Sequence, residues 1–277
     1  LCGILSSVKS SFADQTSADV IFLVGYAAAL IPVLAVLTEC FSRAWASVAS
    51  MQKQMQLVFP ILMTLMAASG GSVSAAIYQP AVAFLSTTIV SVVSAVVLPL
   101  TLTIIAFSVA GNLSSELKLN NFSAFFKSIN KWIIGVCVSV FGIFFTVQGL
   151  TSATYDGITR RAAKYAIGTG VPIVGGFLSG GFDLAVAGSV LIKNSLGSLS
   201  IFLMVSVLFE PLVLLMAANL FLRLTAAVTQ PLGESRISNF LGETADNLNY
   251  CTAGLLFVAF LYFIGIVLVI CSSEVIF

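Results

Sequence analysis

Apolar positions in this chain form continuous runs that alternate with segments of helical periodicity. The uninterrupted apolar runs cover residues 20–38, 132–150 and 252–270. Because a helix needs about 20 apolar residues to cross the hydrocarbon core of a bilayer, each run predicts a plain membrane-spanning helix. Longer apolar stretches that contain glycine and proline, residues 57–80 and 169–197, predict broken helices or re-entrant hairpins.

Four amphipathic helices are expected between these elements, each with its apolar side chains at helical spacing. Their apolar positions are Phe41, Trp45, Val48 and Met55; Ile158, Ala162 and Tyr165; Phe122, Phe125, Phe126 and Ile129; and Ile237, Phe240, Leu241 and Leu248. Such helices serve either as connectors on the membrane surface or as docking sites for partner proteins. The pattern leaves both roles open.

Two pairs of prolines indicate that this arrangement occurs twice. Pro60 and Pro172 are 112 residues apart, and so are Pro99 and Pro211. The segment FPILMTLMAASGG, which contains Pro60, corresponds to VPIVGGFLSGG, which contains Pro172. The first two apolar runs coincide at the same offset. We therefore predict an all-α polytopic integral membrane protein with two tandem repeats of 112 residues and a closing transmembrane helix.

The repeat predicts four parts of the chain. Residues 1–19 form a polar linker, residues 20–131 and 132–249 form the two membrane repeats, and residues 250–277 contain the closing helix and the C-terminus. The first residue is Leu1 rather than methionine, from which we expect a further N-terminal segment.

Composition places this scaffold in a membrane. Apolar residues make up 59% of the chain and charged residues 8%, whereas soluble domains contain about 25% charged residues. No residue between Lys53 and Glu116 carries a charge. We expect roughly five to eight membrane crossings, because the broken stretches can form either hairpins or full spans.

Charge and residue usage exclude several other classes of protein. The net charge of +1, without a basic cluster, gives no basis for binding nucleic acid. The chain has no histidine, which excludes histidine metal sites and Ser-His dyads, and its five cysteines form no CxxC pair. We therefore expect neither a metal nor a cofactor.

The sequence also argues against two types of intramembrane protease, an aspartyl protease and a serine protease. Asp156 and Asp183 resemble only loosely the paired aspartates of aspartyl proteases, since the second motif is Gly-Gly-Phe-Asp and Asp156 lies in a charged connector. Ser179 has no histidine to activate it. We predict that the chain is not an enzyme.

Glycines and isolated charges in the second repeat are the candidates for a polar cavity. Asp183, Lys193 and Glu210 correspond to uncharged residues of the first repeat. An ionisable side chain at membrane depth costs at least about 2.5 kcal/mol, so it usually faces a cavity, a partner or another charge. The predicted cavity or pore lining consists of Gly175, Gly176, Gly180, Gly181, Asp183, Lys193 and Glu210. We expect the turn of the glycine-rich segment near residues 175–181.

Structural roles for the same residues stay open. The glycines can serve tight helix packing, and Asp183 and Lys193 can lie among lipid headgroups at hairpin ends. Glu210 can bond a neighbouring helix to specify packing, although we expect it to face the protein interior or a polar cavity. The expected helix breaks are at Pro60, Gly70, Gly71, Pro99, Pro172 and Pro211.

One block of the chain resembles a known family. The segments YDGITRRAAKYAIGTGVPIVGGFLSGGFDLAVAGSVLIKNSLG and FEPLVLLMAANLFLRL are similar to the stage III sporulation protein AE family of endospore-forming bacteria. The resemblance implies a mother-cell membrane component of the apparatus that joins mother cell and forespore during engulfment. It implies ring-forming partner proteins and a longer N-terminal region, and it supplies no catalytic residues.

These observations lead to one functional prediction with two alternatives. We expect a membrane channel or export-gate component of a sporulation transport complex, with membrane lipid, the other proteins of the apparatus and further copies of the chain as partners. One alternative is an autonomous secondary transporter that couples ions through Asp183, Lys193 or Glu210. The other is a structural platform that recruits ring-forming partners through its amphipathic helices.

Overall fold

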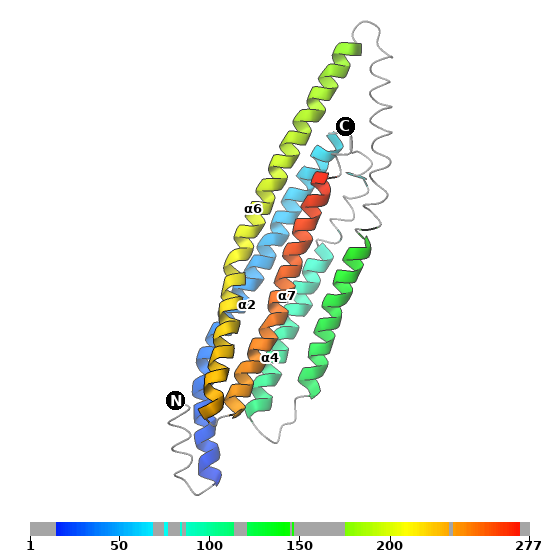
Figure 1. Cartoon of the computed structure of the whole chain (residues 1–277). Coiled ribbons are helices and arrows are strands. Elements are labelled where there is room, and N and C mark those ends of the chain that lie inside the picture. Colours follow the sequence, from blue (N-terminus) through cyan, green and yellow to red (C-terminus); the bar gives the residue numbers. More distant parts are fainter. Residues whose placement is uncertain are drawn as a thin grey trace. The chain divides into compact units, whose positions relative to one another are not determined.

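The structure, a computed structural model, consists of helices throughout the part of the chain that it describes. The described residues are 15–68, 75–76, 84, 87–113, 121–144, 146, 175–232 and 235–271. The elements are α2 (Gln15–Ala68), the π-helix η1 (Val93–Val97), α4 (Leu98–Leu113), a helix over Asn121–Phe144, α6 (Gly175–Thr229), the 3-10 turn η2 (Gln230–Leu232) and α7 (Ser235–Cys271) (Figure 1).

Five of the described helices are long and apolar enough to cross a membrane. They cover Leu23–Ala68, Thr87–Asn112, Asn121–Phe144, Ala187–Thr229 and Ser235–Ile270. These helices confirm the prediction of an all-helical integral membrane protein. The spans on α2 and α6 contain 46 and 43 residues. At 1.5 Å per residue each is roughly 65–70 Å long, about twice the thickness of the hydrocarbon core.

Helix α2 unites three segments that the sequence pattern separates. It runs without a break through the apolar run 20–38, the amphipathic segment and the start of the next apolar stretch (Figure 1). Phe41, Val48 and Met55 are buried, so the predicted apolar face of the amphipathic segment packs within the protein. Trp45, from the same predicted face, is exposed.

The helix break predicted at Pro60 is wrong. Proline removes a single donor, and the helix continues on both sides because the remaining backbone groups have no better partners in hydrocarbon. The hydroxyl of Thr64 donates a hydrogen bond of 2.8 Å to the carbonyl of Pro60 inside the same helix.

Two other prolines at which a break was predicted, Pro99 and Pro211, also lie inside helical structure. Pro99 follows the π-helix η1, in which the Leu98 N–H donates to the carbonyl of Val93. Pro211 lies within α6. Neither proline therefore ends a helix, and the backbone hydrogen-bond pattern changes to a π-turn just before Pro99.

The turn predicted near residues 175–181 is also wrong. Helix α6 begins at Gly175 and includes Gly176, Gly180 and Gly181 in its first two turns. A glycine costs only about 1 kcal/mol relative to alanine inside a helix, and membrane helices tolerate it. The predicted breaks at Gly70, Gly71 and Pro172 lie outside the described residues. Of the two stretches in which a re-entrant hairpin was expected, residues 57–68 and 175–197 are described and lie in continuous helices.

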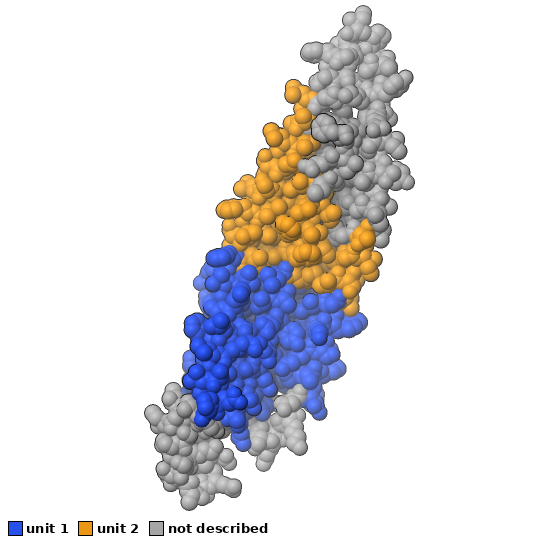
Figure 2. Space-filling view, in the orientation of Figure 1, with its two compact units in different colours: residues 1–47, 92–135, 209–256 blue, residues 48–91, 136–208, 257–277 orange. Residues whose placement is uncertain are grey.

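The chain forms two compact units, each assembled from three stretches of sequence (Figure 2). Unit 1 contains Leu1–Ser47, Val92–Gly135 and Phe209–Leu256, and unit 2 contains Val48–Ser91, Val136–Leu208 and Phe257–Phe277. The boundary predicted between the repeats, at residues 131 and 132, falls inside the helix Asn121–Phe144. The duplication itself stays a prediction.

Unit 1 has an amphipathic segment at its centre. The N-terminal half of α7 buries the apolar positions that the sequence assigns to the membrane surface or to a partner, namely Ile237, Phe240, Leu241 and Leu248. The ring of Phe240 lies 5.4 Å from that of Tyr26 on α2. This segment is therefore part of the core of unit 1. By contrast, Phe122 and Phe125 of the helix Asn121–Phe144 are exposed.

Unit 2 packs closely around two glycines. A Cβ added to Gly197 on α6 would lie 2.4 Å from the side chain of Ile270, and one added to Gly265 on α7 would lie 2.6 Å from the ring of Phe59. The Phe59 ring meets Tyr262 edge-on at 5.9 Å. These glycines thus permit close helix contacts, as small residues do in membrane proteins.

Candidate functional site

Lys193 is fully buried in unit 2, at the end of a neighbouring helix. Its Nζ donates hydrogen bonds to the carbonyls of Val269, at 3.0 Å, and Ile270, at 2.7 Å. Helix α7 ends at Cys271, so these are carbonyls that lack a partner within their own helix. A cation at this end also interacts favourably with the helix dipole. The position gives Lys193 a capping role, and its predicted role in lining a pore stays untested.

Glu210 belongs to an exposed ion-pair cluster in unit 1. Arg43 on α2 donates hydrogen bonds to Glu39, at 2.6 Å, and to Glu210 on α6. The side chains of Glu39, Arg43 and Glu210 are 54%, 48% and 66% exposed. Glu210 therefore does not lie in the interior of unit 1, which was one of its two predicted environments. That it borders a polar cavity stays a prediction.

The glycine-rich segment is described only in its backbone. Gly175, Gly176, Gly180 and Gly181 are helical, and the side chain of Asp183 lies outside the described part. Their predicted lining of a cavity therefore stays a prediction. Farther along α6, a Cβ at Gly188 would meet nothing within 4 Å.

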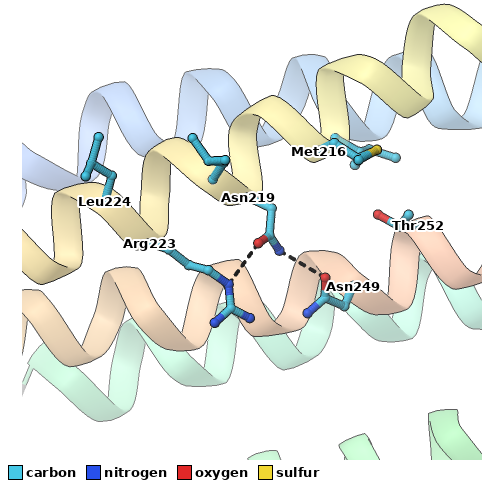
Figure 3. A pocket seen from close by; sticks show the side chains of 8 residues that line it. Met216, Asn219, Arg223, Leu224, Asn249 and Thr252 are labelled. Atoms are coloured by element: carbon cyan, nitrogen blue, oxygen red, sulfur yellow. Dashed lines mark hydrogen bonds between the residues drawn. The ribbon is translucent and has the colours of Figure 1, made fainter.

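A chain of polar side chains joins α6 to α7 within unit 1. Arg223 Nε donates to Asn219 Oδ1 at 2.9 Å, and Asn219 Nδ2 donates to Asn249 Oδ1 at 3.0 Å (Figure 3). Arg223 also pairs with Asp246 at 2.6 Å. Near the turn, the hydroxyl of Ser238 donates to the carbonyl of Ala226 at 2.8 Å. These bonds fix α6 and α7 as a helical hairpin.

An open groove of about 700 Å³ lies beside this polar chain. Leu215, Met216, Leu220, Leu224 and Thr252 line it together with Asn219, Arg223 and Asn249. Figure 3 shows these side chains along the two facing helices. The lining is mainly apolar, with the polar chain along one side.

A second groove, of about 440 Å³, lies nearer the turn of the hairpin and is more polar. Arg223, Gln230, Asn239, Glu243 and Asp246 contribute to its lining. The carboxylate of Glu243 also accepts hydrogen bonds from Ser108 and from Asn112, the latter at 3.2 Å. Glu243 thus lies between this groove and helix α4.

The sequence analysis missed most of these polar partners. It did not single out Arg43, Asn219, Arg223, Glu243 or Asp246, because their bonds join segments that are far apart in the chain. One usable signal was present. Arg223 and Asp246 lie on either side of the turn-forming segment QPLGE, so a helical hairpin would bring them together.

Comparison with known families decides the classification. A family described as "Stage III sporulation protein AE (spore_III_AE)" matches residues 1–273. The chain belongs to the stage III sporulation protein AE family. A curated member, "Stage III sporulation protein AE" of Bacillus subtilis (strain 168), is 26% identical over 273 residues, which are 99% of this chain and 68% of that protein. No solved structure matches the chain.

Family membership confirms the resemblance seen in the block around Tyr155 and makes the chain a sporulation membrane protein. The family is not a known enzyme family. Within the helices that the structure describes, no group of three or more histidine, cysteine or acidic side chains could hold a metal ion.

Proposed function

We propose that this chain forms the membrane channel or export gate of a sporulation transport complex that links mother cell and forespore. Its site is the mother-cell membrane around the forespore, and its partners are the ring-forming proteins of that apparatus and further copies of the chain. Family membership and the five apolar helices support the sporulation and membrane parts of this proposal.

The exposed ion-pair cluster carries the channel part of the proposal. Glu39, Arg43 and Glu210 lie on two helices that can cross a membrane, yet about half or more of each side chain is exposed. A charged side chain that faces hydrocarbon costs at least about 2.5 kcal/mol. An aqueous passage in the assembled complex would remove this cost. We therefore infer that the face of α2 and α6 that bears the cluster borders such a passage.

The transporter alternative receives less support. Two of its three candidate ion-coupling residues have partners within the chain, since Lys193 bonds the end of α7 and Glu210 pairs with Arg43. Such partners favour structural roles. The alternative of a structural platform is supported by exposed aromatic side chains on which a partner could dock, namely Phe122, Phe125 and Trp132 of the helix Asn121–Phe144.

Thiol labelling in sporulating cells tests the proposed passage. In a chain whose native cysteines are replaced, Glu210→Cys should react with a membrane-impermeant thiol reagent. Val205→Cys is the matched control, because Val205 is also exposed on α6 but is about 140° around the helix from Glu210. An unreactive Glu210→Cys, or equal reaction at both positions, would count against a passage along this face.

A further inference from the structure

Unit 1 contains a few fully buried polar side chains in an otherwise apolar core. Three helices meet in it, namely α4, α7 and Asn121–Phe144, and each carries a polar side chain that is fully buried. These side chains are Thr101, Asn130 and Asn247. All three lie on helices that can cross a membrane. Many exposed positions on α2, α4 and α6 are apolar, for example Leu34, Leu102, Leu220 and Phe221.

The packing of α7 against α4 brings these polar residues within about one helical turn of one another along the helix axes. Glu243 on α7 accepts hydrogen bonds from Ser108 and Asn112 on α4, and farther along α7 a Cβ at Gly254 would lie 3.3 Å from Val93 and 3.4 Å from Val97 of the π-helix η1. α7 therefore runs antiparallel to η1 and α4. Between these two contacts Asn247, one turn beyond Glu243, is level with the part of α4 around Ile104, about one helical turn from Thr101. The hydroxyl of Thr101 in turn accepts a 2.9 Å hydrogen bond from Asn130 Nδ2.

Hydrogen bonds within the protein leave part of this layer unsatisfied. The hydroxyl of Thr101 is used twice, because it also donates to the carbonyl of Val97 at 2.7 Å. Asn130 Oδ1 and both side-chain polar atoms of Asn247 have no partner among the described residues. A buried polar group without a partner costs about 1–3 kcal/mol, and native proteins rarely leave one. The hydrocarbon of a bilayer offers no replacement partner.

The chemistry of the unsatisfied atoms identifies the missing ligand. Two are amide oxygens that need a donor, and one is an amide nitrogen that needs an acceptor. A bare metal cation would satisfy only the oxygens. Water both donates and accepts, and buried waters typically make about three hydrogen bonds to such groups.

We propose that unit 1 contains an internal water-binding site between α4, α7 and the helix Asn121–Phe144, formed by Thr101, Asn130 and Asn247. The site lies one helical turn from Glu243, so bound water gives that carboxylate a hydrated neighbour inside the bundle. This inference does not depend on the proposed channel, because the site lies within one copy of the chain.

Radiolytic footprinting of the full chain in lipid nanodiscs tests the site directly. Hydroxyl radicals generated from bound water oxidise side chains next to it even when bulk solvent cannot reach them. Cys251 is the reporter, because it is fully buried and one turn beyond Asn247 on α7. Met51, a reactive side chain that is fully buried in unit 2, is the reference. After each rate is divided by the intrinsic reactivity of the free amino acid towards hydroxyl radicals, we expect oxidation of Cys251 to exceed that of Met51 severalfold.

A matched pair of variants ties the oxidation to the site. Asn247→Leu should reduce oxidation of Cys251 to the level of Met51 and lower the melting temperature by several degrees. Asn239→Leu, which replaces an exposed asparagine on the same helix, should change neither. Equal oxidation of Cys251 and Met51 in the unaltered protein would overturn the proposal, and this comparison stands even if the variant does not fold.

Two other results would also overturn the proposal. A higher melting temperature in Asn247→Leu would mean that the amide is unbonded in a dry core. Stabilisation of the unaltered protein by sodium chloride but not by choline chloride, lost in Asn247→Leu, would mean that the site holds a cation instead of water.

Discussion

Replacement of the buried Lys193 should destabilise the protein far more than replacement of an exposed lysine. Lys193→Met keeps most of the apolar stem but removes the two hydrogen bonds to the carbonyls of Val269 and Ile270. Hydrogen bonds to a charged group contribute about 1.5–3 kcal/mol each, and a cation at a helix C-terminus contributes about 0.3–1 kcal/mol. Partial solvation of the freed carbonyls by lipid headgroups and water reduces the loss. We expect a net destabilisation of about 2–4 kcal/mol.

Thermal unfolding of the purified full chain in a mild detergent measures this loss. A chain of this size loses about 2–4 °C in melting temperature per kcal/mol, so Lys193→Met should melt roughly 5–10 °C lower. Lys53→Met is the control, since Lys53 is exposed on α2 and its replacement should change stability by less than about 0.5 kcal/mol. Equal melting temperatures for the two variants would show that Lys193 does not cap α7.

Two further predictions concern helix packing and the exposed cluster. In the same melting assay, Gly197→Ala should destabilise the protein by about 1–3 kcal/mol, because the new Cβ would lie 2.4 Å from Ile270. Ile270→Ala in the same chain should restore stability. Gly188→Ala is the control and should be neutral or slightly stabilising, because a Cβ there would meet nothing within 4 Å. Glu210→Gln should leave the protein in the membrane but lower the yield of spores, and the double exchange Arg43→Glu with Glu210→Arg should restore part of that yield. Normal sporulation of Glu210→Leu would leave the residue only a packing role.

The class of the protein follows from the sequence because it depends on local quantities. Long apolar runs and scarce charges are sufficient to predict membrane helices, whatever their tertiary contacts. Three of the four positions predicted on the apolar face around Val48 are buried, since helical periodicity is a local property, whereas Trp45 is exposed. The sequence was less informative about where helices end. No glycine or proline separates residues 38 and 41, and α2 continues through them.

Helix breaks were overpredicted for a physical reason that is specific to membranes. Glycine and proline end helices in water because water satisfies the freed backbone groups. In hydrocarbon that compensation is absent, so a helix continues through Pro60 and Gly180 at a modest local cost. The backbone around Pro99 behaves in the same way, since it continues from the π-turn η1 into α4 without ending at the proline.

The predicted cavity lining stays a prediction, but two of its residues take part in interactions of the described chain. The sequence singled out Lys193 and Glu210 as charges in apolar surroundings, and the structure places both in specific interactions. Their partners could not be predicted, because Arg43 and the end of α7 are distant in sequence. The buried layer of Thr101, Asn130 and Asn247 was missed for a related reason. Single polar residues in amphipathic helices give no local sign that they face a protein core.

The mass and symmetry of the complex purified from sporulating cells test the central claim most directly. The proposed channel or gate predicts a closed symmetric assembly with several copies of this chain, in which Arg43 and Glu210 face a continuous passage. It also predicts that the chain alone, reconstituted in liposomes, carries no ion flux. A monomer that transports ions on its own would contradict the proposal and would favour the secondary transporter.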